Sequence, residues 1–333
     1  MAVNIYDIAK KSGLSVVTVS RVLNNYPSVR ESNRIKVAQA ITELDYKPNA
    51  AARTLASGKA GMVALVIPNM QDHFMSGVMS SAEKSLRKNG LFMAVTSASD
   101  SSDFLRSSCA SLFMEGRVDG ILILAPVRDD GAILELKKRN IPFVLLDQHQ
   151  MNNQVPCVTV DNFYGGYQAT MSLIKGGARK IAHISGAKIY ESSSERTRGY
   201  LEALKDSGMK ADDGMLVEGD FTVACGYNAA VGWIKRGILP DAVFAANDNT
   251  AYGILDAARE YGIAVPQKLA IIGYDDHPFD SMLHPQMSTV KQPSEKIGEY
   301  GVKLLLDIIK NKPRKTSRVI LKPEIILRGT TLQ

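Results

Sequence analysis

The sequence predicts a small all-α domain at the N-terminus, followed by a large α/β domain that is built from two lobes. Three observations lead to this fold class. The first 60 residues contain helical patterns only, and they carry most of the excess positive charge. After residue 61, short apolar runs alternate with amphipathic stretches in two successive sets. A chain of 333 residues is long enough for two or three such folding units.

The uneven distribution of charge is consistent with a polyanionic partner for the N-terminal domain. Residues 1–60 contain nine Lys or Arg and four Asp or Glu, which gives +5 of the total net charge of +6. Such an excess in one part of a chain is expected where only that part faces a polyanion such as DNA. A basic surface that is merely solvated is the alternative at this point.

The N-terminal helices have the spacing of a helix-turn-helix. Asn4 is placed to cap a first helix, Gly13 to end it, and Ser15 to cap a second helix. A third helix is expected at about 31–44. This order of cap, glycine turn and second cap puts the first turn of the second helix where it can enter a DNA major groove.

The second helix opens with two valines whose role the pattern leaves open. Val16 and Val17 are expected on the exposed side, because Val19 and Leu23 already fill the inward stripe. The alternative is that both valines belong to the core.

The large domain is expected to consist of two Rossmann-like lobes. Its apolar runs, for example at 62–67 and 143–146, are continuous, as in parallel strands that are buried on both faces. Helices are expected between the runs, for example at about 74–88, 165–175 and 196–207. Such folds bind ligands at the carboxyl ends of their strands.

Several classes of function lack support in the sequence. Cys109, Cys157 and Cys225 are far apart and form no CxxC, so we expect buried, reduced thiols. No nucleophile elbow, Walker loop, GxGxxG or HExxH motif is present, so we expect no enzyme activity, no cofactor and no metal site. No apolar run could span a bilayer and no secretory signal is seen, which predicts a cytoplasmic protein without a membrane partner.

The motif IYDIAKKSGLSVVTVSRVLNN and the α/β region behind it resemble the lactose/galactose repressor family, from about residue 4 to the C-terminus. The resemblance implies a sequence-specific DNA-binding transcription regulator, most often a repressor, that a small polar effector such as a sugar or sugar derivative controls allosterically. It implies three partners: double-stranded DNA with a pseudo-palindromic operator, the small-molecule effector, and a second copy of the chain in a homodimer. The large domain would then share the fold of periplasmic sugar-binding proteins, with the effector in the cleft between the lobes.

The resemblance also assigns roles in DNA binding. Base-edge contacts fall to Val16, Val17 and Arg21, of which the arginine suits a bidentate contact to guanine and the valines suit apolar contacts. Phosphate contacts, which fix the register, fall to Tyr6, Thr18, Ser20, Asn25 and Arg34.

The segment YKPNAAARTLASGK resembles the hinge helix of that family. The run from Ala50 to Leu55 has good helix propensity but almost no apolar face, so it needs a partner. In the family such helices pair across the dimer and insert a leucine, here Leu55, into the minor groove. A flexible linker is the alternative. We predict a helix-turn-helix domain at 1–48, the hinge helix and linker at 49–60, and an effector-binding and dimerisation domain at 61–333, with lobe one at about 61–161 and 291–321 and lobe two at about 162–290 and 322–333.

Candidate effector residues follow several of the predicted strands. Their carboxylates and amides can bind hydroxyl groups, their aromatic rings can stack on a sugar or base, and an arginine can clamp oxygens. By position after a strand or by the resemblance, the candidates are Phe74, Asp147, Asp161, Arg196, Phe221, Asn247, Asp275 and Gln292.

Each candidate has a structural alternative. Asp161 and Asp275 are placed to cap helices, Arg196 suits a surface ion pair, and Phe221 suits the core. His73 beside Phe74 departs from the sugar-repressor pattern, which leaves the identity of the effector open. The sign of the response also stays open, as does a phosphorylated carrier protein as the co-effector, which is the arrangement in the global catabolite regulators of this family.

Overall fold

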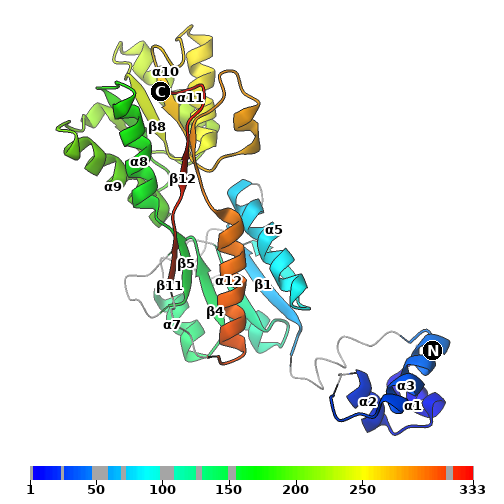
Figure 1. The fold of residues 1–333 in the computed structure, drawn as a ribbon. Coiled ribbons are helices and arrows are strands. Elements are labelled where there is room, and N and C mark those ends of the chain that lie inside the picture. Colours follow the sequence, from blue (N-terminus) through cyan, green and yellow to red (C-terminus); the bar gives the residue numbers. More distant parts are fainter. Residues whose placement is uncertain are drawn as a thin grey trace. The chain divides into compact units, whose positions relative to one another are not determined.

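The structure is a computed structural model that describes residues 3–23, 26–46, 59–68, 73–97, 109–124, 130–148, 155–312 and 318–332. The chain divides into two compact units, Met1–Ala60 and Gly61–Gln333 (Figure 1). Two residues with predicted roles in DNA binding, Asn25 and Leu55, lie outside the described residues, as does most of the predicted hinge helix. The domain and lobe boundaries given above therefore stay predictions.

The first unit contains three helices whose caps follow the sequence prediction. They are α1 (Ile5–Ser12), α2 (Val16–Leu23) and α3 (Glu31–Glu43). The side chain of Asn4 accepts from the N–H of Asp7, and the Asp7 carboxylate accepts from the N–H of Asn4 at 2.9 Å, which is a capping box. Gly13 ends α1 with φ 67°, in the left-handed region that glycine tolerates best. Ser15 Oγ accepts from the N–H of Thr18 at 3.2 Å, so the predicted caps are confirmed.

A small apolar core holds these helices together. Ile8 of α1, Val19 of α2 and Val37 of α3 are fully buried against one another, with Ala40 and Tyr46 at the margin. Helices of 8 to 13 residues are too short to be stable alone, so the stability of this unit depends on the shared core.

The second unit contains two parallel sheets, which we call the first lobe and the second lobe together with the helices that cover them. The first-lobe sheet has the order β11-β5-β4-β3-β1-β2, and the second-lobe sheet has the order β7-β6-β8-β9. In the first lobe the elements are β1 (Met62–Ile67), α5 (His73–Lys88), β2 (Phe92–Ser97), β3 (Gly120–Ile123), α7 (Asp130–Lys138), β4 (Phe143–Leu146), β5 (Cys157–Val160), α12 (Ser294–Ile309) and β11 (Arg318–Leu321). In the second lobe they are α8 (Asn162–Lys175), β6 (Ile181–Ile184), α9 (Glu191–Asp206), η1 (Asp213–Met215), β7 (Leu216–Val217), α10 (Val223–Lys235), β8 (Ala242–Ala245), α11 (Asp248–Glu260), β9 (Ala270–Ile272) and η2 (Pro278–Ser281).

Each sheet is covered on both faces, as the continuous apolar runs predicted. In the first lobe α5 and α12 lie side by side on one face, and α7 packs on the other (Figure 1). In the second lobe α10 and α11 cover one face, and α8 and α9 cover the other. The predicted α/β class is therefore confirmed.

The chain passes between the two sheets three times. It passes after β5, again between β10 (Thr289–Lys291) and α12, and a third time between β11 and β12 (Glu324–Ile326). Strands β10 and β12 pair antiparallel, and Figure 1 shows β12 running from the first-lobe sheet toward the second. These three connections join the two lobes near the carboxyl ends of their strands.

Two helices begin earlier than the sequence predicts. Helix α8 begins at Asn162 because Asp161 caps it, rather than near Gly165. Helix α9 begins at Glu191 rather than near Arg196, because the serines of its first turn have weak helix propensity and hide the start. The second difference places Arg196 in the middle of a helix, where neighbouring helices can bury it.

Candidate DNA-binding surface and effector site

The two valines that open α2 differ in exposure. Val17 is 61% exposed, and Arg21, one turn further along the helix, is exposed too. Val16 is half-buried and packs against the core around Val19. The core alternative therefore holds in part for Val16 and fails for Val17.

The four described residues that are predicted to contact phosphates lie on all three helices. Tyr6 is 69% exposed on the first turn of α1, and Ser20 is half-buried on α2. Thr18 Oγ1 lies 2.9 Å from Ser15 Oγ, so its hydroxyl is held at the start of α2. The guanidinium of Arg34 donates to the carbonyl of Tyr26, which ties α3 to the loop before it. Sequence analysis missed this structural role of Arg34, since no local pattern reveals a contact across eight residues.

In the large unit, most predicted effector residues follow the carboxyl end of a strand. Asp147 follows β4 with φ 54°, and Asp275 follows β9 with φ 117°, both left-handed conformations that are costly for a residue with a side chain. Asp161 follows β5, and Asn247 follows β8. Phe74 lies on the first turn of α5, largely buried in the first-lobe core.

Arg196 is the centre of a buried polar cluster in the second lobe. Its side chain is 3% exposed, so the surface ion pair that the sequence allowed is wrong. Its Nε donates to Asn162 Oδ1 at 2.9 Å, and its Nη1 donates to the carbonyl of Ala246 at 2.6 Å. The guanidinium carbon lies 3.6 Å from the centre of the Tyr274 ring, a cation–π contact. A side chain at Gly166 of α8 would clash with the backbone of Arg196, so glycine allows this close approach of the helices.

Tyr274 connects candidate residues of the two lobes. Its ring is fully buried, and its hydroxyl has no hydrogen-bond partner among the described residues. Burial raises the pKa of Tyr274 well above its usual range; Arg196 lowers it, while Asp275 and Asp147 raise it further. Because Asp147 belongs to the first lobe, the two lobes place their polar groups around the same phenol.

Gln292 lies beside Asp275 in the same region. It is buried, and its Nε2 donates to Asp275 Oδ1 at 2.6 Å. Its Oε1 has no hydrogen-bond partner among the described residues. A buried polar atom without a partner costs free energy of about 1–3 kcal/mol, which a ligand can recover. Tyr274 and Gln292 therefore offer two such atoms next to Arg196 and Asp275.

Asp161 and Asn247 both cap helices. Asp161 Oδ1 accepts from the N–H of Tyr164 at 2.9 Å, so the capping role that the sequence offered for Asp161 is confirmed. Asn247 Oδ1 accepts from Thr250 at the start of α11, and its Nδ2 donates to the carbonyl of Phe221 at 3.1 Å. Asp275 caps no helix, since its carboxylate meets Gln292 instead. The caps fix where these side chains lie, whether or not they also meet an effector.

Phe221 is held in a half-buried aromatic pair rather than in the core. Its backbone has φ 68°, and its half-buried ring covers Gly186, where an added side chain would overlap the ring. Tyr190 meets it edge-on, with the ring centres 5.5 Å apart. Sequence analysis missed Tyr190, Tyr274 and Asn162. The last two adjoin Asp275 and Asp161, so their position after a strand was a usable signal.

Comparisons with known proteins agree with this organisation. A profile described as "Bacterial regulatory proteins, lacI family" matches residues 4–49, and one described as "Periplasmic binding protein-like domain" matches residues 170–331. Catabolite control protein A of Priestia megaterium is 33% identical over 99% of this chain and 100% of its own length. The chain belongs to the lacI family. The HTH-type transcriptional repressor PurR of Klebsiella pneumoniae is 31% identical over 97% of this chain and 95% of its own.

Solved structures of the lacI family match over the same length. The lac repressor dimer bound to operator and the anti-inducer ONPF matches with a TM-score of 0.89 and 27% identity, covering all of both chains. The complex of the transcriptional regulator CelR with cellobiose matches with a TM-score of 0.75 and 31% identity, over 98% of this chain and 99% of the other. Members of the lacI family are DNA-binding transcription regulators, not enzymes. Among the described helices of this lacI-family chain, none is long and apolar enough to cross a bilayer.

Proposed function

We propose that this lacI-family chain is a transcriptional repressor whose affinity for its operator is controlled by a small, uncharged polar effector, such as a sugar. The observation that carries the proposal is the cluster of Arg196 of α9 with Tyr274, Asp275 and Gln292, which follow the carboxyl ends of β9 and β10. Two of its buried polar atoms have no partner among the described residues. Such atoms are costly unless a ligand meets them.

The charges around the cluster favour a neutral effector over an anionic one. Arg196 already lies on the face of Tyr274, and the carboxylates of Asp275 and Asp147 act on the same phenol. A sugar phosphate or sugar acid would bring a further negative charge toward these carboxylates in a poorly solvated region. Hydroxyl groups can donate to the carboxylates and to Gln292 Oε1 without that cost. Cellobiose in CelR is such a neutral ligand.

The proposed effector contacts extend beyond these four residues. Aromatic rings are offered by Phe74 and Phe221, and further polar groups by Asp147, Asp161 and Asn247. Asp161 and Asn247 are the weaker members, because their capping bonds already use one side-chain oxygen each.

The effector proposal is tested by thermal unfolding of the full chain with a panel of ligands. The panel contains cellobiose, ribose, galactose, glucose 6-phosphate and gluconate. A ligand at 100 times its dissociation constant stabilises the folded state by about 2.7 kcal/mol, which raises the midpoint by a few degrees. Asp275→Asn should abolish the shift, whereas Asp256→Asn, an exposed residue on α11, should retain it. A shift given only by the charged ligands contradicts the neutral class, and no shift at all favours a protein co-effector.

For the DNA, we propose a homodimer on a pseudo-palindromic operator, acting in the cytoplasm where the chromosome lies. The lac repressor is a dimer on its operator and matches this chain over its full length. Base contacts are proposed for Val16, Val17, Arg21 and Leu55, and phosphate contacts for Tyr6, Thr18, Ser20, Asn25 and Arg34. The exposure of Val17, Arg21 and Tyr6 supports this assignment.

The hinge proposal makes one prediction about operator binding. A side chain inserted into the minor groove holds the DNA bent. Leu55→Gly should therefore weaken operator binding by at least ten-fold, measured on a duplex that has first been selected from a random pool. Fluorescence anisotropy measures this loss, and the thermal response to effector should not change. An unchanged operator affinity would show that residues 49–60 act as a plain linker.

A further inference from the structure

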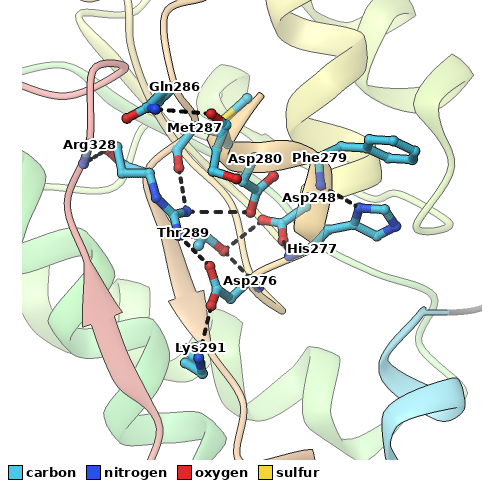
Figure 2. A network of polar contacts seen from close by, with 12 residues as sticks. Asp248, Asp276, His277, Phe279, Asp280, Gln286, Met287, Thr289, Lys291 and Arg328 are labelled. Atoms are coloured by element: carbon cyan, nitrogen blue, oxygen red, sulfur yellow. Dashed lines mark hydrogen bonds and ion pairs between the residues drawn. The ribbon is translucent and has the colours of Figure 1, made fainter. Parts of the chain in front are cut away.

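A second polar cluster lies next to the cluster of Arg196, Tyr274, Asp275 and Gln292, and it consists mainly of charged side chains. Figure 2 shows it: Asp248 of α11, Asp276 and Asp280 of the loop after β9, Arg328 near the C-terminus, and Lys291 of β10. Arg328 lies 2.6 Å from Asp276 Oδ1 and 3.7 Å from Asp280 Oδ2, and Lys291 lies 3.2 Å from Asp276 Oδ2. Three carboxyl groups thus face two cations. The charges balance when one carboxyl group carries a proton.

Asp248 holds the loop after β9 by three routes. Its N–H donates to the carbonyl of Tyr274 at 2.8 Å, and its Oδ2 accepts from the N–H of His277 at 2.9 Å. Its Oδ1 accepts from Thr289 Oγ1 at 2.7 Å, and that hydroxyl accepts in turn from the N–H of Asp276 at 3.3 Å. Asp248 therefore restrains the backbone on both sides of Asp275.

The restraint is needed because the loop is strained. Asp275 and Asp276 have φ 117° and 60°, values that cost free energy for residues with a side chain. Gly273 lies so close to Asp248 that an added side chain would meet Asp248 Oδ1 at 2.1 Å. The Asp248 carboxyl group is thus inserted between α11 and the loop that presents Asp275.

The partner of Asp248 in this cluster is Asp280. Both are buried, and Tyr252 donates its hydroxyl to Asp280 Oδ1 at 2.7 Å. Arg328 is too far from Asp280 Oδ2 for a hydrogen bond, and no other described donor reaches that oxygen. Figure 2 shows the carboxyl groups of Asp280 and Asp248 next to each other, and two adjacent buried carboxyl groups repel each other unless one of them carries a proton.

We propose that Asp248 and Asp280 share one proton, and that this proton positions the loop Tyr274–His277 so that Asp275 can meet the effector. The proposal rests on the proposed effector function of Asp275. Loss of the proton would leave two buried carboxylates side by side and push the loop off α11. Effector affinity should therefore fall as pH rises through the titration of the pair. The charged and titratable groups that face the pair are Tyr252, Asp275, Asp276, His277, Lys291 and Arg328.

The titration behaviour of the pair supports this geometry. Burial raises the pKa of Asp248 far above its usual range, and the charges of Asp280 and Asp275 raise it further. Burial also raises the pKa of Asp280, although Tyr252, Asp248 and Arg328 lower it in part. The shifts of both groups are in the direction expected of a pair that titrates as a unit and holds one proton.

The first test measures proton uptake and needs no effector. Asp280→Asn replaces the shared proton by an amide that donates to Asp248 and still accepts from Tyr252. Urea unfolding of the full chain between pH 4.5 and 9 gives the folding constant at each pH. Within the titration range of the pair, each rise of one pH unit should lower the folding constant of the wild type by up to ten-fold more than that of Asp280→Asn. Asp256→Asn, also on α11 but exposed, should behave like the wild type.

The second test observes the loop itself. The chain contains five histidines, so labelling with ¹⁵N-histidine gives few backbone amide signals, and His277→Asn identifies the signal of His277. Because this amide donates to Asp248, its proton shift should show a pH-dependent step in the wild type that is missing in Asp280→Asn, apart from any step that the imidazole of His277 gives in both proteins. If Asp280→Asn does not fold, Asp248→Asn serves instead in the urea experiment, since its amide can donate to Asp280.

Either of two results overturns the proposal: equal pH slopes for the wild type and the neutral variant, or a His277 amide whose pH response is the same in both proteins. Both measurements are independent of any ligand. A failure here therefore leaves the effector proposal standing, and a ligand panel without a response leaves the shared proton standing.

Discussion

The two buried polar clusters of the second lobe lie side by side but differ in how their hydrogen bonds are used. In the cluster around Arg196, Tyr274 and Gln292 each keep a buried polar atom without a partner among the described residues. In the second cluster, the oxygens of Asp248 hold the backbone N–H of His277 and the hydroxyl of Thr289, and the buried Asp280 Oδ2, which has no described donor, lies where the proposed proton would meet it. The first arrangement is expected of a binding site, where a ligand completes the bonds, and the second is expected of a brace for the backbone.

The largest effect should come from removing the cation of the first cluster. Arg196→Met leaves Asn162 Oδ1 and the carbonyl of Ala246 without their buried donor. We expect a loss of about 3 kcal/mol in the free energy of unfolding, together with the loss of effector binding. Urea unfolding measures it, with Arg198→Met as the control on the same helix. Arg198 is exposed, with an ion pair to Glu195 and a cation–π contact to the ring of Phe163, so its loss should cost about 1 kcal/mol or less. Equal losses for the two variants would contradict a central role for Arg196.

The pH response of the second lobe should have two components of opposite sign. Burial lowers the pKa of His183 to about 4, with a smaller lowering by Arg196. The unfolded chain binds this proton near pH 6.5, and the folded chain does not, so stability falls as pH drops through the window from about 6.5 to about 4. At pH 5 the loss is about 2 kcal/mol relative to pH 8. His183→Gln should remove it, whereas the Asp248–Asp280 pair loses stability toward alkaline pH. An unchanged acid loss in His183→Gln would assign the effect to other groups.

The smallest effects should separate two tyrosines. Tyr252→Phe removes a hydroxyl that donates to Asp280, and we expect it to cost about 1 kcal/mol of stability. Tyr274→Phe removes a hydroxyl without a described partner, so stability should change by less than about 0.5 kcal/mol while effector affinity falls. Urea unfolding and ligand titration on both variants measure the contrast. If Tyr274→Phe is the more destabilising variant, the hydroxyl of Tyr274 is part of the fold rather than of the site.

Local patterns carried much of the prediction. The capping box at Asn4 and the glycine turn at Gly13 involve groups within a few residues of each other, so the sequence contains all the information that they need. The alternation of apolar runs and amphipathic stretches predicted the parallel sheets, because only strands covered on both faces are apolar throughout. The position of Asp275 after β9 is local in the same sense.

What the tertiary structure decided is which distant residues meet. The sequence placed Arg196 among the effector candidates and left a surface ion pair open, and only the close approach of α8 and α9 at their glycines buries it over Tyr274, 78 residues away. The meeting of Asp248, Asp280 and Arg328 depends on the order of strands and on the last crossing of the chain, which no local spacing encodes. Sequence by itself determined the elements and the residues at their ends, because caps and periodicity are short-range. Burial, hydrogen-bond satisfaction and the proton shared by two carboxyl groups were decided only by packing, because they depend on every element around them.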